Sequence, residues 1–261
     1  ETLACVGVLT RTVLDTALAL DIIVGPDERD RFSLPATGER YLENVEKGLG
    51  TPKVAYSPDL KFGVVDPEIA EITRKAALSF EKLGCHVTEI KPDLFDMGDY
   101  WVNMFLAETV EAVGKRFEEW KKVMYPVYAP FIQVEQSLKA RDYARAVFKR
   151  EEFWKKIRKI FEEYNFLLTP TTAVPAWELK EGALGPKKIA GKAVGPTGPV
   201  PFTMPFNFTG QPAANVPCGF TKNGLPVGLQ IVGRRYDDLG VLKASRAFEK
   251  AFPWEDKKPP L

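Results

Sequence analysis

The sequence predicts an α/β fold in which helices cover a largely buried sheet. Residues 53–57 and 86–90 are predicted strands on either side of a helix, and such a strand–helix–strand unit favours parallel pairing. The pair Asn223-Gly224 lies between two apolar runs and indicates a hairpin, because both residues tolerate positive φ. The second run, residues 225–232, is apolar almost throughout, which is typical of a parallel-type strand buried on both faces.

The elements of the first half follow from apolar spacing and capping residues. Residues 8–24 predict a helix that stops at Gly25-Pro26, and the polar, turn-rich residues 26–50 predict a surface excursion. After the strand at 53–57, Asp66 is expected to cap a helix whose first position is Pro67. That helix carries a regular apolar stripe and is expected to end at Gly84, before the alternating strand 86–90.

The second half begins with a long helical block, residues 97–163, which is rich in Lys, Glu and aromatic residues. Pro126 and Pro130 are expected to break the block, and residues 136–164 form its better helix, with its charges on a solvated face. A buried strand at 165–169 follows, then a long Gly- and Pro-rich loop over 175–205. After the hairpin, Asp237 is expected to cap a helix that runs to Phe252.

Composition narrows the classes of function. The 261 residues carry 36 basic and 35 acidic side chains, so nothing indicates a nucleic-acid partner or an anionic membrane surface. No apolar run approaches the roughly 18 residues of a membrane span. Three widely spaced cysteines oppose a disulfide framework and favour a reducing, cytoplasmic compartment. The single histidine, His86, opposes a zinc site and a Ser-His or Cys-His mechanism.

Few residues could carry chemistry by themselves. Ser79 and Lys82 match an SxxK spacing, but the companion motifs are absent, and a surface lysine beside a core-edge serine is favoured. Cys218 has no neighbouring base or cation, which favours a structural cysteine. Arg150 or Arg158 could hold a substrate carboxylate, although a solvated helix arginine is favoured. The residues alone therefore predict no catalytic constellation.

Three stretches together resemble a known family, in their order and rough spacing. They are GVLTRTVLDTALALDIIVGPDERD at 7–30, NFLLTPTTAVPA at 165–176 and PFNFTGQPAANVPCGFTKNGLPVGLQIVGRRYDD at 205–238. They are similar to the later half of the amidase signature family, and the remaining segments fit its stand-alone amidases. The resemblance implies that residues 1–261 are the C-terminal portion of one domain, with a mixed central sheet between helix layers.

The resemblance also implies cleavage or transfer at an amide C–N bond, with a small-molecule amide as substrate and no cofactor or metal. The family's nucleophile is a serine, activated by a second serine in a cis peptide bond and by a lysine, and a Gly/Ser-rich loop binds the oxyanion. No such loop occurs in the chain, so these groups are expected upstream of Glu1 and no catalytic residue is assigned.

The hairpin 216–233 is then expected to complete a sheet whose other strands come partly from that upstream half. Because an open strand edge invites aggregation, the chain is expected to need the half, within the same protein or as a complementary chain. A homo-oligomer stays as a further alternative. A non-catalytic product of a truncated or split gene, acting as a binding subunit, stays as an alternative.

The resemblance supplies candidate substrate contacts. In the glutamine-using tRNA amidotransferase branch of the family, an arginine before the TPT strand holds the glutamine carboxylate, and counting back from Pro170 places Arg150 there. An aspartate holds the amino group in that branch, and its position falls on Val200, which favours a general amidase over the tRNA amidotransferase component. Core packing is an equal alternative for the three residues that the resemblance places in the pocket lining. These residues are Thr203, Met204 and Phe206.

Overall fold

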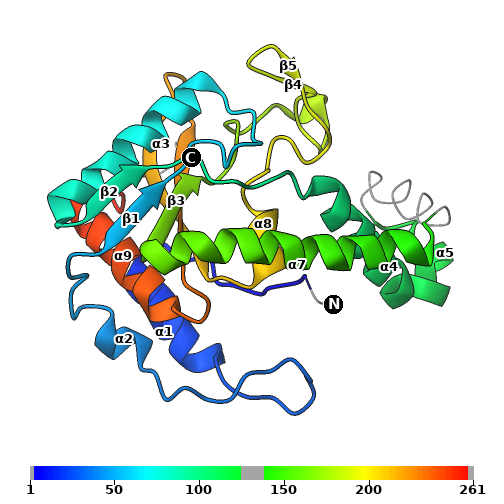
Figure 1. The fold of residues 1–261 in the computed structure, drawn as a ribbon, viewed down its shortest axis with the longest axis horizontal. Coiled ribbons are helices and arrows are strands. Elements are labelled where there is room, and N and C mark those ends of the chain that lie inside the picture. Colours follow the sequence, from blue (N-terminus) through cyan, green and yellow to red (C-terminus); the bar gives the residue numbers. More distant parts are fainter. Residues whose placement is uncertain (1–2, 125–137, 258–261) are drawn as a thin grey trace.

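Five strands form one mixed sheet in the order β2-β1-β3-β7-β6, in a computed structural model that describes residues 3–124 and 138–257 (Figure 1). Strand β1 pairs in parallel with β2 and β3, whereas β7 runs antiparallel to β3 and β6. The α/β fold with a mixed, helix-flanked sheet is therefore confirmed. The strands are β1 Lys53–Tyr56, β2 His86–Glu89, β3 Phe166–Pro170, β6 Ala213–Phe220 and β7 Pro226–Gly233.

The prediction of a parallel-type strand at 225–232 is wrong: β7 is antiparallel to β3 as well as to β6, its partner in the predicted hairpin. Strand β7 is buried along most of its length, with Leu168 opposite Ile231 and Val216 opposite Leu229, but both of its partners are antiparallel. A continuous apolar run reports burial on both faces and carries no information on strand direction. The two edge strands are β2 and β6, and no strand of the described residues pairs with the outer side of either.

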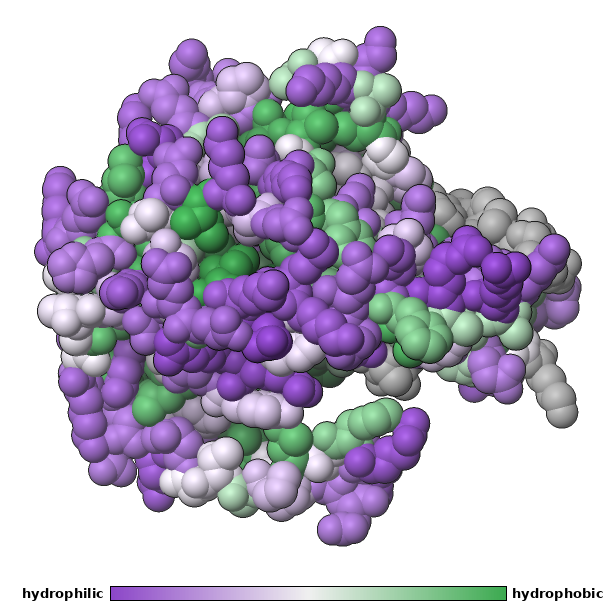
Figure 2. Space-filling model, in the orientation of Figure 1, coloured by the Kyte–Doolittle hydropathy of each residue, from purple (hydrophilic) through white to green (hydrophobic). Residues whose placement is uncertain are grey.

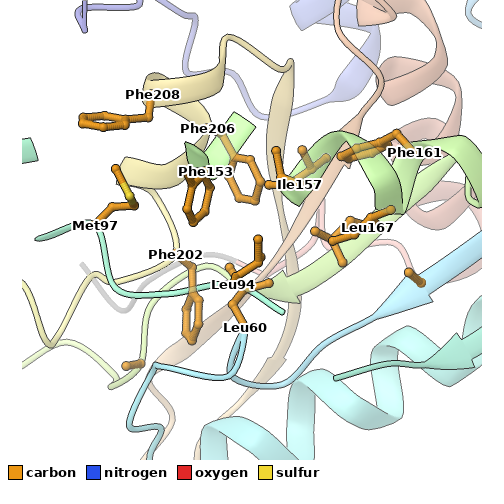
Figure 3. Close-up of a cluster of buried hydrophobic side chains, with 14 of the residues drawn as sticks. Leu60, Leu94, Met97, Phe153, Ile157, Phe161, Leu167, Phe202, Phe206 and Phe208 are labelled. Atoms are coloured by element: carbon orange, nitrogen blue, oxygen red, sulfur yellow. The ribbon is translucent and has the colours of Figure 1, made fainter. Parts of the chain in front are cut away.

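Two apolar cores lie on opposite faces of this sheet. Helices α3 and α9 cover one face, where Phe80 and Phe248 stack with their ring centroids 5.4 Å apart. Helices α7 and α8 cover the other face, where Leu167 and Val232 join a buried aromatic cluster (Figures 1 and 3). The helices are α3 Pro67–Ser79, α7 Ala140–Glu163, α8 Met204–Thr209 and α9 Asp238–Ala251.

Helix α1 (Val13–Ile23) starts later than predicted, because the side chain of Thr12 accepts the N–H of Asp15 and so marks the first turn. The polar segment 26–50 is more ordered than a surface excursion, since it contains α2 (Tyr41–Asn44). The carboxylate of Asp21 accepts the N–H groups of Tyr41 and Leu42, at 2.7 and 3.0 Å. A residue of α1 therefore caps α2, which the local sequence of 26–50 does not reveal.

Helix α3 begins and ends as the sequence predicts. The carboxylate of Asp66 accepts the N–H of Glu68 at 2.8 Å, and a 3-10 turn at Phe80–Leu83 leads to Gly84 at φ 85°.

We expect Asp66→Ala to lower the free energy of unfolding by about 1 kcal/mol, since the first turn of α3 loses its capping acceptor. Urea unfolding of the protein measures the change. Asp66→Ser, which keeps a capping oxygen, is the matched control and should lose much less. Equal losses in the two variants would contradict a capping role.

The helical block at 97–163 consists of α4 (Gly98–Val113), α5 (Phe117–Trp120) and α7. The predicted breaks at Pro126 and Pro130 lie outside the described residues. Helix α7 packs on α4 and on the sheet, and Figure 2 shows hydrophilic residues along its exposed side, as predicted for a solvated face. None of the described helices is long and apolar enough to cross a membrane.

The predicted loop over 175–205 is only partly a loop. It holds a 3-10 turn at Leu179–Glu181 and a small separate hairpin formed by β4 (Lys188–Ile189) and β5 (Lys192–Ala193), and α8 begins at Met204. Helix α9 follows β7 and is capped by Asp237, whose carboxylate accepts the N–H of Gly240 at 3.0 Å.

Candidate substrate site at the carboxyl end of β3

Polar groups gather where β3 ends. Gln230 lies opposite Thr169 in the β3–β7 register and is only 5% exposed. Its Nε2 atom donates to Thr169 Oγ1 at 3.0 Å and to the carbonyl oxygen of Phe202 at 2.9 Å. Because side chains alternate along a strand, Gln230 shares a face with Val232, which belongs to the core beneath α7. One end of this face is therefore apolar and the other is polar.

The polar region continues toward the sheet edge. Thr171 Oγ1 lies 2.6 Å from Asn215 Oδ1 on β6, and the N–H of Thr171 donates to the carbonyl of Gly228. A Cβ atom at Gly228 would overlap Asn215 Oδ1 and crowd Thr171 Oγ1, so a larger residue would force these side chains to move. Ligands of α/β sheets commonly bind at the carboxyl ends of parallel strands, which makes this end of β3 the candidate site.

The segment before α8 crosses this end of the sheet. Its Pro199 carbonyl accepts the N–H of Ala173 at 2.9 Å, which ties the segment to the residues after β3. The ring of Phe202 is fully buried and belongs to the same cluster as Leu60 and Leu94 (Figure 3). A Cβ atom at Gly63 would come 2.7 Å from Phe202 Cζ, so the ring lies directly against this glycine.

The predicted pocket residues lie at the end of this segment and at the start of α8. Thr203 is half-buried, and its hydroxyl donates to the carbonyl of Val200 at 3.2 Å. Met204 and Phe206 are 7% and 3% exposed, and Phe206 is part of the cluster beneath α7. Thr203 therefore follows directly after the residue that Gln230 holds, while Phe206 takes part in core packing.

Arg150 joins α7 to the same segment. Its Nε atom donates to the carbonyl oxygen of Phe208 at 2.5 Å, and its guanidinium carbon lies 5.7 Å from the centroid of the Phe208 ring. Burial lowers the pKa of Arg150, and the nearby carboxylate of Glu108 opposes that shift. The structure thus brings Arg150 to the last turn of α8, one turn beyond Thr203 and Met204.

A cavity of about 1050 Å³ lies beside Glu108, the carboxylate that interacts with Arg150. Glu108 and Tyr143 contribute to its wall, and the Tyr143 hydroxyl donates to Glu108 Oε1 at 3.2 Å. Its other walls come from α4 and from the segment 29–32. The remaining lining residues are Ala4, Arg29, Asp30, Arg31, Phe32, Ala107, Glu111 and Ala112.

The other sequence candidates have structural contacts. The Ser79 hydroxyl donates to the carbonyl of Ala76 at 2.6 Å and Lys82 is exposed, so the ordinary-helix interpretation of SxxK is confirmed. Arg158 pairs with Glu162 on the surface of α7. Burial raises the pKa of Cys218 to about 12, which disfavours the reactive thiolate and supports a structural cysteine.

We expect Gly63→Ala to displace the Phe202 ring, because the added methyl group would overlap it. Such overpacking costs roughly 1–3 kcal/mol, measured as a lower free energy of unfolding. Gly7→Ala is the matched control, since a Cβ atom there meets nothing within 4 Å. Wild-type stability in Gly63→Ala would show that the ring does not depend on this contact.

The fold and the site together define an α/β chain with a candidate small-molecule site at its polar strand ends. The Amidase family model matches residues 1–242, and the chain therefore belongs to the amidase signature family. An acylamidase from Rhodococcus erythropolis is 34% identical over 259 residues, which cover 97% of this chain and 53% of that protein. The A component of the glutamyl-tRNA(Gln) amidotransferase from Thermodesulfovibrio yellowstonii is 26% identical, over 98% of this chain and 56% of that protein.

Solved structures agree with this assignment. A bacterial aryl acylamidase of the amidase signature family superposes with a TM-score of 0.86 and 28% identity, over 96% of this chain and 55% of that chain. The A component of the glutamyl-tRNA(Gln) amidotransferase from Thermotoga maritima gives a TM-score of 0.72 and 26% identity, over 97% of this chain and 54% of that chain. The chain spans about half the length of these relatives, and the predicted family membership is confirmed.

Proposed function

We propose that residues 1–261 form the substrate-side part of an amidase-signature hydrolase that cleaves amide C–N bonds. The observation that carries the proposal is the family match over residues 1–242 by a chain about half as long as its relatives. The serine, the cis serine and the lysine of the family's mechanism would come from a part of the domain outside these residues. That serine would attack the amide carbonyl, the amine would leave, and water would release the acyl group.

Two exposed apolar surfaces support the proposal that a further part of the domain packs against these residues. Helix α1 has apolar residues on all sides, and its Leu18, Ile22 and Ile23 are 47%, 76% and 55% exposed. A helix that is apolar all round is normally buried. The second surface is the outer edge of β6, where Phe220 is 48% exposed. We propose that the catalytic half of the domain covers both surfaces, either in the same protein or as a second chain.

The pocket wall would come from α8 and α7. Thr203 offers a hydroxyl that can accept a hydrogen bond from a substrate N–H while it donates to Val200. Met204 and Phe206 would limit the apolar side of the pocket. Arg150 would supply a planar donor for a substrate carbonyl or carboxylate from its place beside Phe208.

Amide hydrolysis by the protein isolated from its native source tests the proposal. Release of the amine from a panel of aryl and aliphatic amides is the readout, with glutamine as a comparison substrate. Turnover of the simple amides above that of glutamine supports a general amidase. Absence of all amide hydrolysis would favour the alternative of a non-catalytic binding subunit, and a preference for glutamine would favour the amidotransferase component.

We expect Val200→Asp, made in the active protein, to improve glutamine hydrolysis. The added carboxylate would face the substrate α-ammonium group, whose burial without an opposing charge is costly. Val200→Asn, which is similar in shape but neutral, is the matched control. Retained fold without any gain in glutaminase activity would contradict the placement of Val200 in the pocket.

A further inference from the structure

Gln230 is a polar side chain in the interior of the sheet. Strand β7 is paired on both sides, and its neighbouring residues Leu229 and Ile231 are fully buried. Burying an amide group is unfavourable unless its hydrogen bonds are satisfied. Gln230 meets this requirement with two donated bonds, one to a strand residue and one to the segment before α8.

A chain of hydrogen bonds fixes the direction of the Gln230 amide. The Thr169 hydroxyl donates to the carbonyl of Pro170 at 2.8 Å, so its oxygen is left to accept from Gln230 Nε2. The second hydrogen of Nε2 then points to the carbonyl of Phe202, at 2.9 Å. Through this bond the sheet holds the carbonyl oxygen of Phe202, a backbone atom of the segment that crosses the end of β3.

We infer that Gln230 positions the segment that carries Thr203 and Met204, and thereby sets substrate affinity. The Phe202 carbonyl belongs to the peptide bond that leads into Thr203, so its orientation determines where the Thr203 backbone begins. The Phe202 ring, packed against Gly63, holds the same residue from the other end. Gln230 is thus a positioning residue rather than a catalytic one, and the inference rests on the function proposed above for this segment.

The Gln230→Met variant tests the inference, because methionine has a similar shape and no donor. In the amide-hydrolysing protein, we expect hydrogen–deuterium exchange over residues 199–209 to rise by about tenfold. We expect KM to rise about tenfold with kcat changed less than twofold, since the segment binds the substrate without reacting with it.

Val232→Ala is the matched control, because Val232 lies on the same strand and face but belongs to the apolar end. It should lower the melting temperature and leave both the segment's exchange and KM unchanged. A rise in KM in Val232→Ala equal to that in Gln230→Met would overturn the inference, since general destabilisation would then explain both. Unchanged exchange and KM in a folded Gln230→Met protein would overturn it as well.

Two further results distinguish a failure of this inference from a failure to fold and from a failure of the proposed function. If Gln230→Met does not fold, Thr169→Val removes only the group that orients the amide. It should give a smaller change of the same kind, and no change would overturn the inference. If the unaltered protein hydrolyses no amide, the proposed function fails, and with it the link to affinity. The exchange measurement then decides by itself whether Gln230 holds the segment.

Discussion

Residues 1–261, produced without any other part of the domain, are expected to hydrolyse no amide and to associate or aggregate in solution. The chain has no Gly/Ser-rich nucleophile loop, and the described structure leaves the outer edge of β6 and the apolar side of α1 exposed. Light scattering after size-exclusion chromatography measures the association, and amine release measures the activity. Co-expression with the complementary half of a related amidase should restore a defined, active species.

A charged substitution on α1 serves as the control for the predicted association of the isolated chain. Ile22→Glu should reduce association of the isolated chain, because Ile22 is 76% exposed and has little packing to lose. The same variant should impair recovery of activity with the complementary half. A monodisperse, monomeric wild-type chain would contradict the proposal that these surfaces need a cover.

The second large effect is expected for Phe202→Ala. The ring is fully buried in the apolar cluster that α7 covers (Figure 3). It also lies against Gly63. Removal of such a ring costs about 3–5 kcal/mol, because the lost burial is combined with a cavity that collapses only in part. Urea unfolding of the protein in its active form measures the loss.

Phe148→Ala is the matched control, since this phenylalanine lies on the surface of α7, outside the two surfaces proposed to be covered, and is 77% exposed. It should change the free energy of unfolding by less than about 1 kcal/mol. A loss in Phe202→Ala no larger than that in Phe148→Ala would show that the segment before α8 is not anchored through its ring.

Local signals in the sequence predicted the parts of the fold that depend on near neighbours. The Asp66-Pro67 start of α3, its end at Gly84 and the hairpin at Asn223-Gly224 all follow from capping and turn chemistry. The antiparallel pairing of β7 with β3 could not be predicted, because burial does not determine the direction of a strand relative to its second neighbour. The short helix α2 was missed for a related reason, as its cap, Asp21, lies in another helix.

The candidate site was predicted less completely. The resemblance pointed to Thr203, Met204 and Phe206. The structure places Thr203 next to the residue whose carbonyl Gln230 holds and places Phe206 in the core beneath α7, and a role of these residues in binding stays a prediction. Gly63 and Phe202 carried no local signal, since their roles come from contacts between residues far apart in the chain. A lone glutamine within an otherwise apolar strand is the one local feature that could have drawn attention to Gln230.

The intact mass of the protein isolated from its native source tests the central claim most directly. The account predicts a mass well above the 29.2 kDa of residues 1–261, because a working amidase needs the catalytic half in addition to this substrate-side part. A native protein of 29.2 kDa, purified as a stable monomer, would contradict the account. In that case nothing would cover the edge of β6 or the apolar side of α1.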